Sequence, residues 1–153
     1  DTTDTTTTEA PTTEAPTTEA PTTEAPVTEA PTSDLGQQIA NFACQFVGNP
    51  YVWGGTSLTN GADCSGFVQS VYKNFGYSLP RTCTPQSNAG TAVSLAALAP
   101  GDLVFYDHGT GSCEHVGIYI GNGQIVHASS SRTGIKISNV NYSTPFKACR
   151  IVN

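Results

Sequence analysis

The hydrophobic positions in the first part of the folded region recur at helical spacing in two separate segments. Leu35 and Ile39 belong to the first segment, and Phe67 and Val71 belong to the second. Apolar residues three and four positions apart form one face of an α-helix, so two amphipathic helices are predicted. They would run from Ser33 or Asp34 to Gly48, and from the capping residue Asp63 to Gly76.

After Pro100 and Gly101 the pattern changes to short runs rich in β-branched and aromatic residues, separated by turn residues. Such runs predict strands. Helices followed by a series of antiparallel strands are typical of the α+β class, here with the N-terminal helices packed on an antiparallel sheet. The five predicted strands are Leu103–Tyr106, His115–Ile120, Gln124–Ser129, Ile135–Val140 and Lys147–Val152.

The hairpin around residues 121–123 has a register that its hydrophobic pattern determines. A turn of two residues would mix apolar and polar side chains on each face, whereas a three-residue loop pairs Ile120 with Gln124 and separates them. In that register His127 lies diagonal to His115, within reach of its side chain. The pattern therefore predicts that two histidines meet on one face of the sheet. The other face would carry Val116, Ile118, Ile120, Val126 and Ala128.

Residues 1–33 differ in composition from the rest of the 153-residue chain. They contain 14 Thr, five Pro and seven acidic residues, and from Thr7 to Pro31 they form five pentapeptides of the type Thr-Thr-Glu-Ala-Pro. A segment without aromatic residues cannot bury a core, and regularly spaced prolines favour an extended chain. A disordered linker is therefore predicted for residues 1–33, followed by one domain over residues 34–153.

The formal net charge of −6 comes from this linker, because the domain has five acidic and six basic residues. The basic residues form no cluster, which argues against nucleic-acid binding. The sequence also has no apolar run long enough to span a membrane. Thr- and Pro-rich repeats are typical of surface stalks. We therefore expect an extracellular or cell-surface location, with further domains upstream and with the protein acting as a monomer.

The five cysteines are an odd number, so at most four of them can pair within the chain. Cys64 stands at the start of the second predicted helix, where unpaired N–H groups and the helix dipole favour a thiolate. A nucleophilic thiol also needs a base. His108 lies in a polar, loop-like stretch, whereas His115 and His127 lie on predicted strands. From spacing alone, a structural role for these residues stays open.

Several motifs resemble those of the NlpC-type cysteine peptidases, and they occur in the order found in that family. The resemblance extends from about Asp34 to Val152. It implies a papain-like α+β fold and a cysteine peptidase, without a metal or cofactor, that cleaves bacterial cell-wall peptidoglycan at the stem-peptide bond from γ-D-glutamate to diaminopimelate or lysine. The motifs are Tyr51-Val52-Trp53-Gly54-Gly55, Asp63-Cys64-Ser65-Gly66-Phe67-Val68, Leu79-Pro80-Arg81-Thr82, Pro100-Gly101-Asp102-Leu103-Val104-Phe105, His115-Val116-Gly117-Ile118-Tyr119-Ile120-Gly121 and Ile125-Val126-His127-Ala128.

The resemblance also implies roles for individual residues. Cys64 would be the nucleophile, His115 the general base and acid, and His127 the group that orients His115. The substrate-binding residues would be Tyr51, Trp53, Asp63, Ser65 and Arg81.

A simpler structural role remains open for each of the expected substrate-binding residues. Tyr51 and Trp53 are large enough to be core residues. Asp63 and Ser65 could only satisfy the start of the helix. Arg81 could bind a stem-peptide carboxylate or merely cover a face of the domain.

Two cysteines depart from the pattern that is usual in this family. Cys83 and Cys113 would flank the catalytic groove and are expected to form one disulfide. The second expected disulfide joins Cys44 to Cys149, which is one of three possible connectivities and leaves Cys64 as the free thiol.

Three other functions are alternatives to a peptidase. An amidase or an acyl transferase would use the same Cys–His site, and a non-catalytic wall-binding module would not need a thiol beside two imidazoles. A zinc site of Cys113, His115 and His127 is disfavoured because the first two are only two positions apart and no fourth ligand is evident.

Overall fold

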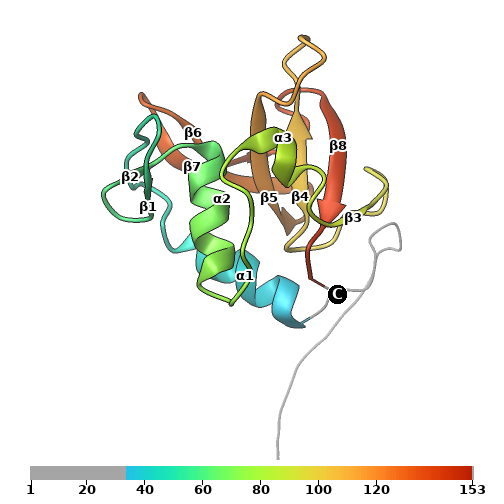
Figure 1. Cartoon of the computed structure of the whole chain (residues 1–153), viewed down its shortest axis with the longest axis horizontal. Helices are drawn as coiled ribbons and strands as arrows, with labels where there is room; N and C mark the ends of the chain where they lie inside the picture. Colours follow the sequence, from blue (N-terminus) through green and yellow to red (C-terminus); the bar gives the residue numbers. More distant parts are fainter. Residues whose placement is uncertain (1–33, 153) are drawn as a thin grey trace, which may run out of the picture. The chain divides into compact units, whose positions relative to one another are not determined.

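The computed structural model describes residues 34–152 (Figure 1). The linker predicted for residues 1–33 lies outside the described residues. The helices are α1 (Asp34–Cys44), α2 (Cys64–Lys73) and α3 (Cys83–Gln86). The strands are β1 (Thr56–Ser57), β2 (Gly61–Ala62), β3 (Thr91–Ala92), β4 (Leu103–Tyr106), β5 (His115–Gly121), β6 (Gln124–Ser130), β7 (Gly134–Asn139) and β8 (Pro145–Arg150).

Strands β3 to β8 form one antiparallel sheet in the order β3-β8-β4-β5-β6-β7, and β1 and β2 form a separate pair. The predicted α+β class, with N-terminal helices on an antiparallel sheet, is confirmed. The element bounds differ in detail. The first helix ends at Cys44, before the predicted stop at Gly48, and β7 and β8 begin slightly earlier than predicted.

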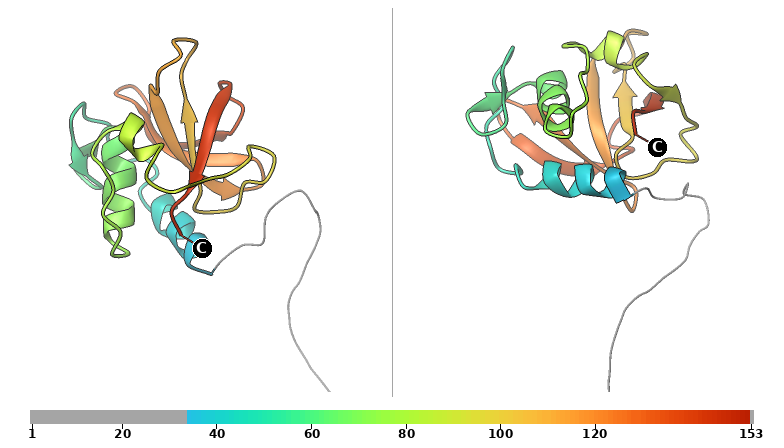
Figure 2. Two further views of the ribbon diagram at one scale, coloured as in Figure 1. Left: turned by 45° about the vertical axis from the view of Figure 1, so that its right-hand side comes forward. Right: turned by 60° about the horizontal axis from the view of Figure 1, so that its bottom comes forward.

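Helices α1 and α2 pack on the same face of the sheet, against β5 and β6 (Figure 2). The apolar face predicted for the hairpin lies in this core, and the helices contribute the side chains at their predicted apolar spacing. A smaller apolar cluster covers the other face. The fully buried side chains of the main core include Ile39, Ala43, Phe67, Val68, Val71, Leu103, Phe105, Val116, Ile118, Val126 and Ala128.

The β5–β6 hairpin reaches the predicted register by a different turn. Ile118 pairs with Val126 as expected, but Gly121 instead of Ile120 pairs with Gln124. The turn therefore contains only two residues, and a bulge in β5 at residue 120 supplies the extra position that the hydrophobic pattern requires. Asn122 has a φ of 56°, which suits a two-residue hairpin turn.

A partly buried ion pair joins the end of β8 to the residue before β4. Arg150 donates from Nε to Asp102 Oδ1 and from Nη2 to Asp102 Oδ2, both at 2.8 Å. Asp102 is 1% exposed and also accepts the backbone N–H of Ala99 at 2.8 Å. The hydroxyl of Tyr72 on α2 donates to the carbonyl of the neighbouring Gly101. These contacts hold the second helix, β4 and β8 together at one end of the sheet.

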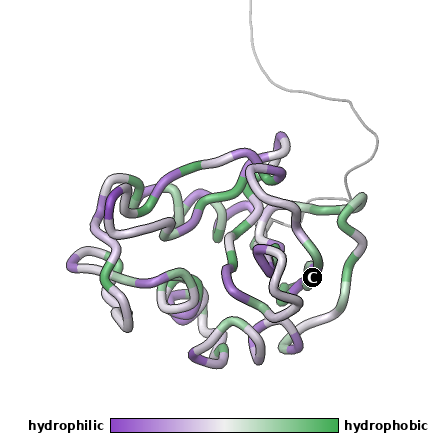
Figure 3. The backbone as a smooth tube through the Cα atoms, turned by 90° about the horizontal axis from the view of Figure 1, so that it is seen from above, coloured by the Kyte–Doolittle hydropathy of each residue, from purple (hydrophilic) through white to green (hydrophobic). Residues whose placement is uncertain are grey.

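The apolar residues are distributed over many short elements. In Figure 3 hydrophobic and hydrophilic stretches of the backbone tube alternate along the chain. Within residues 34–152 the helices are all too short or too polar to cross a membrane.

Candidate active site

Cys64 is the first residue of α2, and the preceding residue fixes this helix start. Asp63 caps the helix, since its Oδ1 accepts the backbone N–H of Gly66 at 2.8 Å. The Cys64 side chain is only partly exposed, and the backbone N–H groups of Ser65 and Val116 interact with its thiol. Val116 directly follows His115 on β5, so the fold brings the start of the helix to the start of the histidine-bearing strand.

The two strand histidines form a direct hydrogen bond. His115 Nε2 lies 2.6 Å from His127 Nδ1, and both side chains are buried. The other ring nitrogen of His127, Nε2, lies 2.9 Å from the hydroxyl of Ser138 on β7. Gly117 permits this arrangement, because a Cβ there would lie 3.3 Å from the Cβ of His127. The two hydrogen bonds that link Ser138, His127 and His115 occupy Nε2 of His115. They leave its Nδ1 for proton exchange with a thiol.

Burial sets the protonation of the histidine pair. It lowers the pKa of His115 to about 3, with smaller contributions from His127 and His108. It also lowers the pKa of His127 to about 4, with a contribution from Lys136. Both imidazoles are therefore neutral at pH 7.

Burial also raises the pKa of the Cys64 thiol, and its effect is larger than that of the nearby N–H groups, which act in the opposite direction. The helix start alone predicted a lowered pKa, so the structure corrects that expectation. Desolvation of the thiolate is the physical reason. At rest the site holds a protonated thiol and a neutral imidazole, and the histidine is able to act as a base when the thiol attacks.

We expect the reactivity of Cys64 to reflect this resting state. Alkylation of Cys64 by iodoacetamide, followed site by site with mass spectrometry, should stay slow at neutral pH and rise only above the ordinary thiol pKa of about 8.5, because burial raises the pKa of this thiol. Cys44 is the internal control, because it is also a free, partly exposed thiol whose pKa is raised by burial. A rate for Cys64 that is already maximal at about pH 6 would show a preformed thiolate and contradict this assignment.

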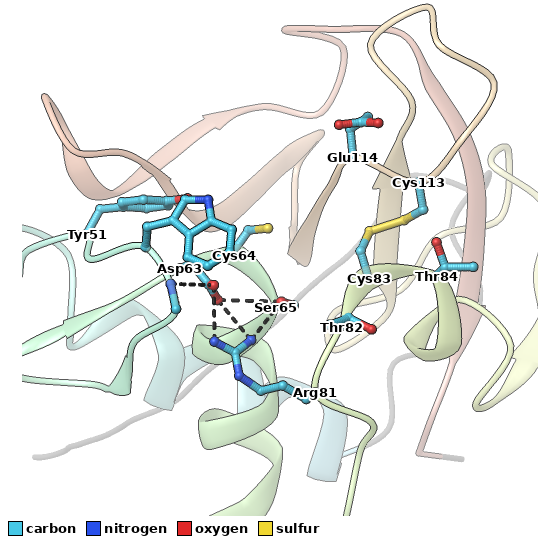
Figure 4. A pocket seen from close by; sticks show the side chains of 12 residues that line it. Tyr51, Asp63, Cys64, Ser65, Arg81, Thr82, Cys83, Thr84, Cys113 and Glu114 are labelled. Carbon is cyan, nitrogen blue, oxygen red and sulfur yellow. Dashed lines mark hydrogen bonds and ion pairs between the residues drawn. A yellow bond between two sulfur atoms is a disulfide. The ribbon is translucent and has the colours of Figure 1, made fainter.

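The thiol opens onto a cavity of about 540 Å³. All five residues expected to bind substrate line it, and Figure 4 shows Cys64 between Tyr51 and a disulfide. Trp53 is 86% exposed, so it is not a core residue. Tyr51 contacts the edge of the core and also lines the cavity. The lining residues are Tyr51, Trp53, Gly54, Asp63, Cys64, Ser65, Arg81, Thr82, Cys83, Thr84, Cys113 and Glu114.

Asp63, Ser65 and Arg81 form one polar network in this cavity (Figure 4). Arg81 donates from Nη1 and Nη2 to the two carboxylate oxygens of Asp63, each at 3.1 Å, and from Nη1 to the Ser65 hydroxyl at 3.0 Å. Burial alone would raise the pKa of Asp63, but hydrogen bonds from Arg81, Gly66 and Gly54 outweigh it and the pKa is lowered. The charged carboxylate of Asp63 thus lines the cavity and also caps α2.

Cys83 and Cys113 form the expected disulfide, with their Cα atoms 5.9 Å apart, and both line the cavity. The second expected disulfide is wrong, because Cys44 and Cys149 are both free. Cys149 lies on β8, where its thiol is 3.5 Å from the carbonyl of Gln86, the last residue of α3. Cys44 ends α1, which packs on β5 and β6. The described residues therefore contain three free thiols instead of one. Because Cys113 is oxidised, the zinc site weighed from the sequence loses one of its ligands.

Two residues beside the histidines had not been singled out from the sequence. Ser138 lies on the same strand as Lys136, which pairs with His127, so strand alternation places both on one face. That signal was present in the sequence but needed the β6–β7 register. Tyr142 comes from the loop after β7, and its ring lies 5.1 Å from that of His127. A loop residue without a periodic pattern gives no comparable signal.

The family model that matches this chain is that of the NlpC/P60 family, over residues 48–152. The chain belongs to this family of cysteine peptidases, which confirms the resemblance of its motifs.

Individual relatives agree with this assignment. The chain is 42% identical over 105 residues to a gamma-D-glutamyl-L-lysine dipeptidyl-peptidase of Bacillus cereus, covering 67% of this chain and 31% of the relative. It is 47% identical over 111 residues to a gamma-DL-glutamyl hydrolase of Bacillus subtilis, covering 71% and 26%. The crystal structure of the NlpC/p60 domain of the peptidoglycan hydrolase SagA superposes with a TM-score of 0.69 at 36% identity, covering 76% of this chain and 98% of that one. The chain thus spans less than a third of the length of these two curated relatives.

Proposed function

We propose that the domain is a peptidoglycan endopeptidase that cleaves stem peptides at the bond from γ-D-glutamate to diaminopimelate or lysine. The observation that carries the proposal is the thiol of Cys64, which lines a cavity and lies beside the start of β5, where His115 is hydrogen-bonded to His127 on β6. The two curated relatives described above are both named for reactions at γ-glutamyl bonds, which supports the choice of bond.

The proposed reaction begins with attack of Cys64 Sγ on the carbonyl carbon of the γ-glutamyl amide. His115 Nδ1 takes the thiol proton as the S–C bond forms, and the resulting imidazolium gives this proton to the departing amine nitrogen. The backbone N–H of Cys64, at the start of α2, is placed to donate to the oxyanion. Water then attacks the thioester, again with His115 as base, and releases the acid and the thiol.

His127 acts in this scheme through His115. Its hydrogen bond to His115 Nε2 fixes the direction in which His115 Nδ1 points, and Ser138 fixes the ring of His127 in turn. For His115 Nδ1 to act as the base, neutral His115 carries its proton on Nε2 and donates it to His127 Nδ1. Neutral His127 then carries its own proton on Nε2 and donates to the Ser138 hydroxyl, so one tautomer of each ring satisfies both contacts.

We assign the polar network of the cavity to recognition of the stem peptide. Asp63 and Ser65 present oxygens to polar groups of the substrate, while Arg81 is already paired with Asp63 and acts by holding its carboxylate in place. Tyr51 and the exposed indole of Trp53 offer aromatic surface beside the thiol.

We further propose that residues 34–153 form the catalytic domain and residues 1–33 a linker to domains upstream, in a secreted protein that acts at the cell surface as a monomer. The pentapeptide repeats support the linker. The Cys83–Cys113 disulfide supports an oxidising, extracellular compartment.

Digestion of purified cell walls tests this function. Walls with lysine and with diaminopimelate in the stem peptide would be treated with the protein, and the released fragments would be identified by mass spectrometry. We expect new amino termini at the third stem residue, and none with Cys64→Ala. Release of whole stem peptides from the glycan would instead indicate an amidase, and exchange of the acyl group onto an added amine would indicate an acyl transferase. An unchanged wall would leave only the wall-binding alternative.

A further inference from the structure

The ring of Tyr142 lies against both histidines of the proposed catalytic site. Its centroid is 5.1 Å from that of His127 and 6.4 Å from that of His115. Tyr142 belongs to the connection between β7 and β8, where its backbone N–H donates to the carbonyl of Asn139 at 2.9 Å. The proposed reaction gives this side chain no task, although it lies beside the hydrogen bond that joins the two imidazoles.

Two more aromatic side chains complete the surroundings of His115. The ring of Tyr106, on β4, is 6.1 Å from that of His115 and 5.1 Å from that of Tyr142. His108, from the loop after β4, stacks on His115 at 5.9 Å with an angle of 21° between the rings. Of these neighbours, Tyr142 is the one that contacts both catalytic histidines and Tyr106, so its ring spans the pair.

The side chain of Tyr142 is well placed to cover the two histidines, because it is neither buried nor fully exposed. It is 44% exposed, whereas His115 is 6% and His127 is 0% exposed. Side chains of loops can be replaced without removing a sheet hydrogen bond, so the ring is not needed to hold the sheet together. Removing it would bring water to two imidazoles that the rest of the fold encloses.

We propose that Tyr142 is a positioning residue, whose ring shields the His115–His127 hydrogen bond from water and holds the His115 ring in its orientation toward Cys64. This inference rests on the proposed function, because it takes these histidines as catalytic. This shielding depends on the aromatic ring of Tyr142 and not on its hydroxyl. Burial and the nearby Cys64 raise the pKa of the Tyr142 hydroxyl to about 12, so the phenol stays protonated and neutral over the working range of pH.

The effect on pH dependence follows from the groups that face His115. These are His127 on β6, His108 in the loop after β4, Tyr106 on β4 and Tyr142 itself, while Lys136 on β7 acts on His127 and Cys64 on α2 acts on Tyr142. Burial is the largest cause of the low pKa of His115. Removing the Tyr142 ring reduces the burial of His115, so the pKa of His115 should rise toward its usual value. As the pH is lowered, the imidazole should then become protonated at a higher pH than in the parent protein.

The test compares Tyr142→Phe, Tyr142→Ala and the control Phe146→Ala. Phe146 is a similarly exposed aromatic residue on β8, at 41% exposure. On a defined γ-D-glutamyl stem peptide we expect Tyr142→Ala to lower kcat by about 10- to 100-fold with little change in KM, as for other changes that misplace a catalytic group. The acid limb of its pH profile should shift upward by about one pH unit. Tyr142→Phe and Phe146→Ala should stay within about threefold of the parent.

Each other outcome overturns the proposal. A loss confined to KM would make Tyr142 a substrate contact, and equal losses in Tyr142→Phe and Tyr142→Ala would assign the effect to the hydroxyl. A similar loss in Phe146→Ala would indicate general damage to β8 and the connection before it. An unshifted acid limb in Tyr142→Ala would show that the ring does not shield the pair.

Histidine titration by NMR keeps the test independent of the substrate. The Cε1–H signals of His115 and His127 in the free protein should titrate at higher pH in Tyr142→Ala than in the parent and in Tyr142→Phe. If the parent protein cleaves no stem peptide, the proposed function fails, while the NMR titration still decides whether Tyr142 shields the histidines. Equal titration in all variants would refute the shielding even if the parent is active.

Discussion

Cys64→Ala is expected to abolish hydrolysis of stem peptides, because the variant has no atom that can form the thioester. His115→Ala should lower kcat/KM by at least about 10³-fold, since it removes both the acceptor of the thiol proton and the donor to the leaving amine. Turnover of a defined γ-D-glutamyl peptide measures both effects. Circular dichroism and thermal unfolding should show that both variants are folded.

Variants of His127 should lose activity in a graded way. His127→Asn and His127→Gln keep a side chain that can hydrogen-bond to His115 Nε2, so they should retain measurable turnover, whereas His127→Ala should lose more. Ser138→Ala should lose least, because it removes only the partner of the second ring nitrogen. If His127→Ala proved indistinguishable from the parent on a defined stem peptide, the assigned role of the histidine pair would be wrong.

The largest expected effect on stability comes from the ion pair of Arg150 and Asp102. Arg150→Met removes two hydrogen bonds at 2.8 Å and leaves the buried Asp102 carboxylate without a counter-charge. Removing the counter-charge of a buried carboxylate in this way typically lowers the free energy of unfolding by about 3 to 5 kcal/mol. Urea unfolding under non-reducing conditions, which keep the Cys83–Cys113 bridge intact, measures the change.

Lys147→Met is the matched control for this change. Lys147 lies on the same strand, and its ammonium donates to the exposed side chain of Asn88 at 2.7 Å. A surface contact of this kind contributes little, so the control should change the free energy of unfolding by about 0.5 kcal/mol or less. A double variant, Asp102→Asn with Arg150→Met, should recover part of the loss because no buried charge remains. Equal stability of Arg150→Met and Lys147→Met would contradict this account.

The elements that the sequence predicted well are those in which local pattern and tertiary packing agree. The apolar spacing of α2 and its cap at Asp63 place Cys64 at a helix start in both the sequence and the structure. The alternation in β5 and β6 likewise brought His115 and His127 together. In both cases the period of the buried positions defines the geometry of the site.

Other features depend on contacts between distant parts of the chain. The hydrophobic pattern required one extra residue in the hairpin, but it could not distinguish a longer loop from a bulge at residue 120. The pair of Asp102 and Arg150 joins residues 48 positions apart, and no periodicity links them. The predicted pairing of Cys44 with Cys149 is wrong for the same reason, because it also concerns residues far apart in the sequence. The number of cysteines does not tell that Cys44 ends a helix packed on β5 and β6 while Cys149 lies on β8, beyond β4.

The pKa of the Cys64 thiol differs in direction from the sequence-based expectation for another reason. A position at a helix start favours a thiolate, and this can be recognised from sequence. Burial of the Cys64 side chain opposes it, and burial depends on the walls of the completed cavity. The direction of the pKa shift therefore follows only from the folded structure.

Labelling with a stem-peptide analogue tests the central claim most directly. The analogue carries a chloromethyl ketone in place of the scissile γ-D-glutamyl amide, and the modified residue is found by peptide mapping. We predict one adduct per molecule, on Cys64, which forms more slowly when excess intact stem peptide is present. The free thiols Cys44 and Cys149 serve as internal controls and should remain unmodified at the same probe concentration. An adduct on either of them, or labelling of Cys64 that intact stem peptide does not slow, would contradict the account.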